Sequence, residues 1–186
     1  MMSSFRLLIF FVFILIGSGH AFATTMTIIE YAKNPFGQVL FMRHALAPGT
    51  GDPGHFEVSV CATQRNLDEV GRQQARDLGA HMTKLDLSFA SVFSSQWCRC
   101  LETATLLEQG KVIELPGLNS FYQNIVPRAE TLQSLHQFLD SLDNKNSPVL
   151  MVTHFVTINA VTGISVSSGG AVAYDVVTGE AVEVIF

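Results

Sequence analysis

Short apolar runs alternate with amphipathic segments along most of this chain. Short, mostly apolar stretches, typical of buried strands, lie at 39–42, 89–93, 112–115 and 149–153. Helical spacing of apolar residues, or a favourable start signal, predicts helices over 68–83, from 94 to about 107, and over 128–142. The segment 24–37 is expected to be irregular, and 172–176 with 181–186 to form a closing hairpin. Strands alternating with helices predict an α/β domain, a three-layer α/β/α sandwich with a mostly parallel central sheet.

The N-terminal pattern differs from the rest of the chain. Arg6 is followed by an unbroken apolar run at 7–16, and Ala21 and Ala23 then form a small-x-small exit. This order is typical of a secretory signal peptide over residues 1–23, with a mature domain over residues 24–186. The run is too short to span a bilayer comfortably, so we expect no stable membrane anchor after cleavage. An uncleaved anchor is the alternative.

Composition limits the classes of partner. The chain has 186 residues, with 11 Lys and Arg against 16 Asp and Glu, for a net charge of −5. A mildly acidic balance argues against nucleic acid as the main partner. The positive mean hydropathy of +0.31 is raised by the N-terminal apolar run, so the rest of the chain has the balance of an ordinary soluble domain.

Three cysteines, Cys61, Cys98 and Cys100, follow the predicted cleavage site. An exported protein is permitted a disulfide, and Cys98 and Cys100 lie too close in sequence to bridge easily. We therefore expect Cys61 to pair with one of the other two, leaving one thiol free. A zinc site that includes His55 is the alternative, although the spacing fits no regular structural zinc pattern.

Cationic side chains follow two of the predicted strands. The strand at 39–42 leads directly into Arg43 and His44, and the strand at 149–153 leads into His154. Ligands of open α/β sheets bind at the carboxyl ends of the strands, so these side chains are expected to meet there. Guanidinium and imidazole groups together suit a phosphoryl group. The alternative, that both histidines are core residues, is less compatible with their place at strand ends.

Two further blocks complete the pattern. One contains Arg65 and Leu67 and leads into the helix at 68–83. The other begins at Ser94 and Ser95, continues to Arg99, and contains a Glu-Thr-Ala sequence at 102–104. Together with the strand ends at Arg43 and His44 and at His154, these blocks make four motifs. In their order along the chain, the four motifs resemble the histidine phosphatase (phosphoglycerate mutase-like) superfamily, and specifically its small, single-domain branch 1. The resemblance covers nearly the whole mature chain.

The resemblance implies a role for each matching residue. His44 is the expected nucleophile, with Arg43, Arg99 and His154 around the phosphate. Arg65 is expected in a binding or supporting position, although an ordinary ion pair is an equal alternative. A neutral imidazole attacks phosphorus in line when its other nitrogen is held as a hydrogen-bond donor. This scheme requires no metal and no cofactor.

One departure concerns the general acid. Many members of the superfamily protonate the leaving group with a carboxylate after the third strand, but the segment here has Asn119 and no acid between Glu114 and Glu130. The acid is therefore missing, or it is Asp52, Glu57 or Glu130. Small phosphohistidine phosphatases of the superfamily also lack this acid.

These observations predict an exported phosphatase, periplasmic or secreted, that acts through a phosphohistidine on His44. Its substrate is expected to be a small phosphomonoester, an activated phosphoryl compound or a phosphorylated cell-envelope component. The alternative is a phosphate-binding module with little or no turnover. Mutase activity is a third and weaker reading, because an exported chain is remote from glycolytic intermediates.

Overall fold

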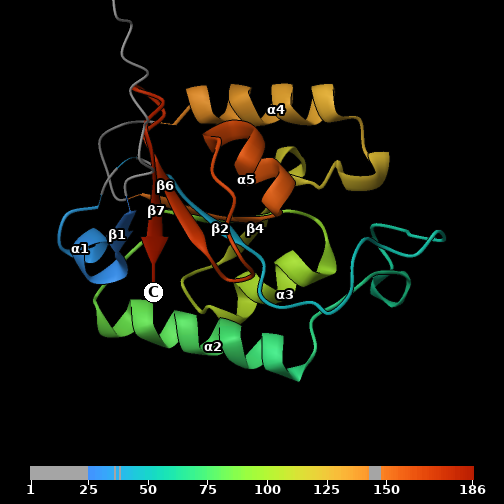
Figure 1. Ribbon diagram of the computed structural model, residues 1–186, viewed down its shortest axis with the longest axis horizontal. Coiled ribbons are helices and arrows are strands. Elements are labelled where there is room, and N and C mark those ends of the chain that lie inside the picture. Colours follow the sequence, from blue (N-terminus) through green and yellow to red (C-terminus); the bar gives the residue numbers. More distant parts are fainter. Residues whose placement is uncertain (1–24, 36, 38, 143–147) are drawn as a thin grey trace, which may run out of the picture.

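The computed structural model describes residues 25–186 except 36, 38 and 143–147 (Figure 1). The predicted signal peptide and its predicted cleavage boundary lie outside these residues. The strands are β1 Thr25–Thr27, β2 Val39–Arg43, β3 Val92–Ser94, β4 Val112–Glu114, β5 Val149–Thr153, β6 Ala171–Tyr174 and β7 Ala181–Ile185. The α-helices are α1 Ile28–Lys33, α2 Glu69–Lys84, α3 Cys98–Leu106, α4 Arg128–Asp140 and α5 Phe155–Thr162. Short 3-10 turns lie at Cys61–Thr63, Pro116–Leu118 and Tyr122–Asn124.

The strands form one mixed, mostly parallel sheet, as predicted. Its order in the described chain is β1-β7-β6-β2-β5-β3-β4. The pairs β2–β5, β5–β3, β3–β4 and β1–β7 are parallel, whereas β6 is antiparallel to both of its neighbours. The antiparallel pair β6–β7 is the predicted closing hairpin. β2 and β5 lie side by side at the centre, so their carboxyl ends open on the same edge.

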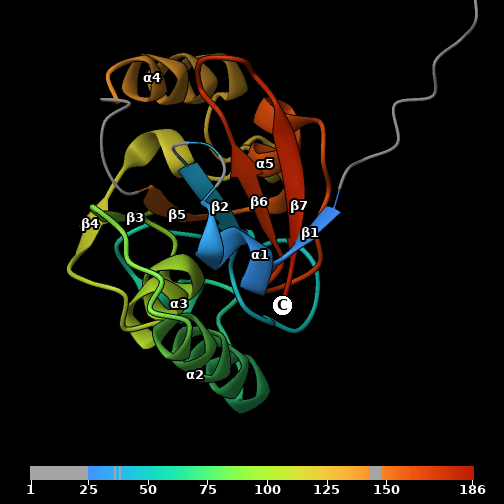
Figure 2. The same cartoon turned by 90° about the vertical axis from the view of Figure 1, so that its left-hand side faces the viewer.

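Helices cover both faces of the sheet (Figures 1 and 2). Leu40 and Met42 of β2 pack into a core cluster shared with α1, α2 and α3. Val39 and Phe41, which point to the opposite face, pack into a second cluster with α4 and α5. The period-two alternation of β2 therefore divides the core into two layers.

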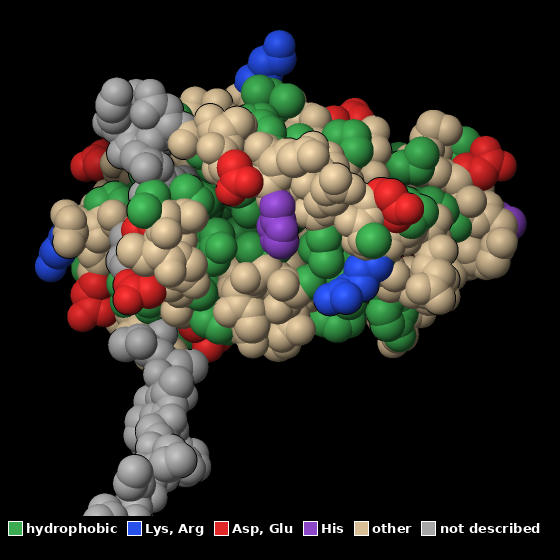
Figure 3. Space-filling view, turned by 90° about the horizontal axis from the view of Figure 1, so that it is seen from above, with side chains coloured by type: hydrophobic (Ala, Val, Ile, Leu, Met, Phe, Trp, Pro, Cys, Tyr) green, Lys and Arg blue, Asp and Glu red, His purple; other side chains and the backbone are tan. Residues whose placement is uncertain are grey.

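The outer surface over α4 is mixed in character. Seen from above in Figure 3, small groups of hydrophobic side chains are interspersed with acidic and other polar ones. Among the residues described, no helix is both long enough and apolar enough to cross a membrane.

Several predicted boundaries need correction. The helix expected from Ser94 begins at Cys98, because Ser94 is the last residue of β3 and Trp97, which precedes the helix, has an extended backbone. The segment expected to be irregular contains β1 and α1, and α1 begins with a capping box between Thr27 and Glu30. Helix α5 was not predicted. The expected helices at 68–83 and 128–142 are present as α2 and α4, within two residues at each end.

Candidate active site

His44 and His154 come together at the carboxyl edge of the sheet. In the parallel pair β2–β5, Arg43 is opposite Thr153, so the residue after each strand is a histidine. The two imidazole rings have centroids 5.4 Å apart, and both residues are only 2% exposed. The sheet register alone therefore produces the predicted pair.

The main chain fixes the tautomer of His44. Its Nδ1 lies 2.8 Å from the carbonyl oxygen of Ala45, and a carbonyl only accepts, so Nδ1 carries the proton. The Ala45 amide in turn donates to Thr103 Oγ1, which donates to the carbonyl of Arg99. Burial, and then the nearby Arg99 charge, lower the pKa of His44 to about 3. His44 is thus neutral at physiological pH, with a lone pair on Nε2.

Arg99 lies directly against this lone pair. Its Nε donates to His44 Nε2 at 3.2 Å. Its other side is held by Asp52, through Nη1 at 2.8 Å and Nη2 at 3.1 Å. Both side chains are 3% exposed. The bidentate pair leaves the Nε edge of the guanidinium facing the histidines, where it can contact a phosphoryl group.

Asp52 also accepts hydrogen bonds from the Arg65 amide at 3.0 Å and from Trp97 Nε1 at 3.0 Å. Burial by itself would raise the pKa of Asp52, but hydrogen bonds from Arg99 and the Arg65 amide lower it overall. Asp52 is therefore an ionised carboxylate fully occupied by donors. In this position it orients Arg99, and it has no proton to donate to a leaving group at neutral pH.

Arg43 and Arg65 supply two more guanidiniums. Arg43 Nη1 donates to the carbonyl of Val166 at 2.9 Å, while its buried Nε has no hydrogen-bond partner within the described chain. Arg65 donates through Nε to the carbonyl of Gly51 at 2.8 Å and through Nη1 to that of Ala47. Backbone carbonyls thus hold both side chains beside the cavity, and the orphaned Nε of Arg43 is the kind of donor that an anion would satisfy.

His154 belongs to a buried hydrogen-bond chain. Its Nε2 lies 2.9 Å from Ser95 Oγ, which in turn donates to Asn119 Oδ1 at 3.1 Å. Because the Ser95 proton is used on Asn119, His154 Nε2 is the donor to Ser95. Its Nδ1 then accepts from Arg99 Nη2 at 3.4 Å. His154 is thus held beside the phosphoryl position, but donation to a phosphoryl oxygen requires a second proton on Nδ1.

These groups surround a cavity of about 220 Å³. Its lining residues are Arg43, His44, Gly49, Thr50, Gly51, Arg65, Arg99, Ser120, Tyr122, His154 and Phe155. The structure therefore brings together all five basic residues predicted for the site. None of the lining residues in the described chain is acidic. Of the three carboxylates considered as general acid, Asp52 lies behind Arg99, while Glu57 is exposed on the loop and Glu130 lies on α4.

A disulfide joins the loop after β2 to the start of α3. It links Cys61 and Cys98, one of the two pairings predicted, and Cys100 remains a buried free thiol. Burial raises the pKa of Cys100 to about 12, so the thiol is neutral. Because two of the cysteines are consumed in the bridge, the alternative zinc site is not formed in this structure. Gln64 adds a second tie, since its Oε1 accepts from the Cys98 amide at 2.9 Å.

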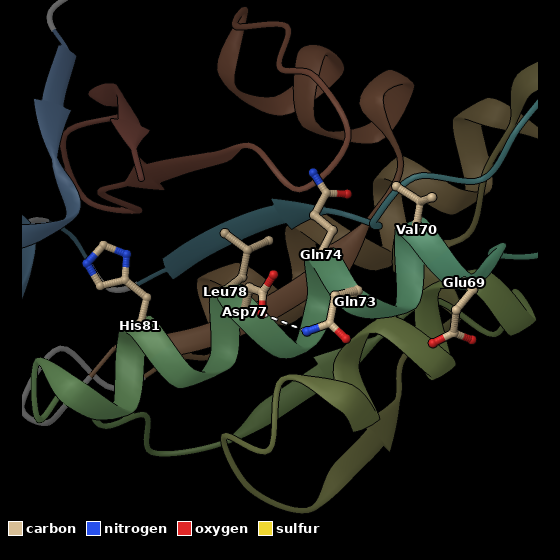
Figure 4. Close-up of a pocket in the computed structure, with 7 residues that line it drawn as sticks. All are labelled: Glu69, Val70, Gln73, Gln74, Asp77, Leu78 and His81. Atoms are coloured by element: carbon tan, nitrogen blue, oxygen red, sulfur yellow. Dashed lines mark hydrogen bonds between the residues drawn. The ribbon is translucent and has the colours of Figure 1, made fainter.

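A larger hollow, of about 690 Å³, lies elsewhere on the molecule. Figure 4 shows that its labelled side chains, from Glu69 to His81, all project from α2. It is an open helix face, and none of its lining residues also lines the cavity that holds His44 and His154. The smaller cavity, which gathers the guanidinium and imidazole groups, is the candidate active site.

Sequence reasoning missed several residues that shape the site. Ser95 was noted only as part of a motif, and the hydrogen bond from Trp97 to Asp52 was not predicted. The mouth residues Tyr122 and Phe155 were not singled out. The position of Phe155, directly after His154, is the one local signal that places an aromatic ring beside the phosphoryl position.

Comparison with solved structures supports the fold. SixA from Agrobacterium tumefaciens matches with a TM-score of 0.51 and 19% identity, over 74% of this chain and 89% of that one. The protein histidine phosphatase SixA in complex with tungstate matches with a TM-score of 0.52 and 15% identity, over 78% and 92%. TTHB049 from Thermus thermophilus matches with a TM-score of 0.55 and 20% identity, over 80% and 99%. No curated protein matches the chain significantly in sequence.

The family comparison bears on the site itself. The model of the histidine phosphatase superfamily (branch 1) matches residues 39–124. This range contains Arg43, His44, Arg65 and Arg99, and the structure adds His154 from the strand next to β2. The chain therefore has a phosphoglycerate mutase-like fold, and over residues 39–124 it is similar to branch 1 of the histidine phosphatase superfamily.

Proposed function

We propose that this protein is an exported, metal-independent phosphatase that hydrolyses a phosphomonoester or an activated phosphoryl compound through a phosphohistidine on His44. The observation that carries the proposal is the tautomer of His44. A buried neutral imidazole, with its proton held on Nδ1 by the Ala45 carbonyl, presents a lone pair on Nε2 to the cavity.

The reaction balances in two displacements. In the first, His44 Nε2 forms a bond to phosphorus as the bond to the leaving oxygen breaks, and the leaving group departs with that electron pair. In the second, water attacks phosphorus, phosphate is released, and Nε2 regains its lone pair. The Arg99 Nε contact to His44 is exchanged for a phosphoryl oxygen when substrate binds. Arg43, Arg65 and Arg99 balance the phosphoryl charge, so catalysis rests on positioning and electrostatics.

The export part of the proposal rests on the N-terminal pattern, and the Cys61–Cys98 bridge supports it because stable disulfides are typical of oxidising compartments. The substrate would then be met in the periplasm or outside the cell, as a small phosphorylated compound or an envelope component. Exported protein should begin at Thr24, and N-terminal sequencing that returns Met1 would contradict cleavage.

One observation favours a second candidate, a phosphate-binding module with little turnover. The cavity lining has no acid in the described chain, so a poor leaving group would depart without a proton from a carboxylate. The rate of turnover distinguishes the two candidates.

The test is a turnover screen of purified mature protein on a panel of phosphorylated compounds, with and without EDTA. We expect phosphate release that persists in EDTA and disappears in His44→Ala. The matched control is His136→Ala, because His136 is exposed on α4, away from the cavity. Phosphate binding without release from any compound would favour the binding module.

A further inference from the structure

The mouth of the catalytic cavity has an aromatic wall. Tyr122 and Phe155 both line the cavity, with ring centroids 5.9 Å apart and planes at 59°. They remain 39% and 37% exposed. The two rings therefore form a partly exposed apolar surface beside a strongly cationic pocket, where a ligand would cover it.

The wall is fixed relative to the phosphoryl position. Phe155 is the first residue of α5 and directly follows His154. The guanidinium of Arg43 lies 5.2 Å from the centre of the Phe155 ring, and Arg43 is itself held by the carbonyl of Val166. The ring is thus oriented by the same arginine that faces the phosphoryl group.

The loop at 49–51 also lines the mouth, and it is joined to the segment that carries Tyr122. The Asp52 amide donates to Gln123 Oε1 at 2.7 Å, and Gln123 adjoins Tyr122. Gln123 has a φ of 63°, a conformation that only a minority of non-glycine residues adopt. Gly51 leaves room for this contact, since a Cβ there would lie 2.6 Å from Gln123 Oε1. The mouth is therefore a preformed slot that is lined by a thin loop and two rings.

The size and chemistry of the cavity restrict what fits the slot. At about 220 Å³ the cavity is smaller than the roughly 300–1,000 Å³ of sites that enclose drug-sized ligands. It can enclose a phosphoryl group and the first part of a leaving group. Among the residues described, the lining offers no carboxylate or amide side chain to bind sugar hydroxyls, whereas the two rings offer a surface for a flat apolar group.

We propose that Tyr122 and Phe155 form a leaving-group subsite, and that the preferred substrates are phosphate esters that carry a planar aromatic ring at, or one carbon from, the ester oxygen. This inference rests on the proposed phosphatase function for its catalytic meaning. The aromatic contact itself is a binding property, and it can be measured without turnover.

The first experiment measures binding of non-hydrolysable phosphonates by calorimetry. Wild-type protein should bind phenylphosphonate about three- to tenfold more tightly than cyclohexylphosphonate, the range expected for an aromatic pair beyond its buried area. Tyr122→Leu and Phe155→Leu should each move this ratio toward one. Phe121→Leu is the matched control and should keep it, because Phe121 packs against Arg128, at 5.4 Å, and is not part of the lining.

The second experiment compares turnover of benzyl phosphate and cyclohexylmethyl phosphate, whose leaving alcohols have similar acidity. A higher kcat/KM for the benzyl ester, reduced in Tyr122→Leu, supports the subsite. Equal phosphonate affinities in wild type, or a ratio that survives both leucine substitutions, would overturn it. Selective phosphonate binding by a protein that releases phosphate from no compound in the turnover screen would leave the subsite standing and count against the phosphatase. Turnover without any preference for the aromatic ring would support the phosphatase and count against the subsite.

Discussion

Replacing Asp52 with Asn tests the claim that this carboxylate orients Arg99 and is not the general acid. Asp52 accepts four hydrogen bonds, two of them from Arg99, and both side chains are 3% exposed. Asn keeps the shape but removes the charge. Breaking a buried ion pair costs about 3–5 kcal/mol, and we expect the lower end because the amide oxygen still accepts.

The expected loss of about 3 kcal/mol corresponds to a fall in Tm of about 6–12 °C for a domain of this size. The lowered pKa of Asp52 determines how its contribution to the free energy of unfolding changes with pH. Its contribution is present above the unfolded value of about 3.9 and is lost as pH falls through the lower folded value, so the full difference appears at pH 7. Misplacement of Arg99 should also lower kcat, by about 10- to 100-fold.

The assay combines thermal unfolding with a series of aryl phosphates of graded leaving-group acidity. Without an acid, the wild-type rate should depend steeply on leaving-group acidity, and Asp52→Asn should lower every rate while keeping that slope. Glu57 is an exposed carboxylate on the same loop, and Glu57→Gln is the control. This substitution should change neither the Tm nor the dependence of rate on leaving-group acidity. A flat wild-type dependence that steepens in Asp52→Asn would refute the reasoning, and so would an unchanged Tm.

Three further outcomes are expected. Arg99→Lys should lower kcat/KM by about 10²–10³, because an ammonium cannot reproduce the guanidinium edge; near-normal kinetics would remove Arg99 from the phosphoryl contacts. Peptide mapping should find Cys61 bonded to Cys98. Cys61→Ser should lower the unfolding free energy by about 3.8 kcal/mol for the 37-residue separation, and urea curves that match wild type would contradict this. The pKa of His44 is about 3 in the folded state and 6.5 in the unfolded state. Its contribution to the free energy of unfolding is therefore complete above pH 6.5 and is about 2 kcal/mol smaller at pH 5. Urea unfolding at pH 7 and pH 5 should show this loss in wild type relative to His44→Gln, and parallel pH dependences would contradict it.

The predictable part of the fold was encoded locally. β2 and β5 are mostly apolar, and each is followed directly by a histidine that the parallel register brings to one edge. Helix α2 was predicted closely because Asp68 caps it by accepting from the Gly71 amide. Local patterning and strand-end chemistry were therefore sufficient for the framework and for the basic residues of the site.

The parts that were missed depend on weaker or longer-range signals. α5 consists largely of residues with modest helix propensity, and its clearest signal is Gly163, which ends it at a φ of 73°. α1 is marked only by its short capping box. The role of Asp52 could not be predicted, because its partner Arg99 lies 47 residues away and only the folded loop brings them together. The same holds for Tyr122 and Phe155, which come from distant parts of the sequence and meet in one wall of the mouth.

The central claim is that His44 Nε2 accepts the phosphoryl group. The most direct test is rapid quench of turnover in the presence of EDTA, under alkaline conditions that preserve phosphohistidine, followed by peptide mapping and phosphorus NMR. The account predicts a transient phosphoryl group on Nε2 of His44 that forms and decays at rates compatible with kcat and is absent in His44→Ala. A phosphoryl group on any other residue, or turnover that continues in His44→Ala, would contradict it.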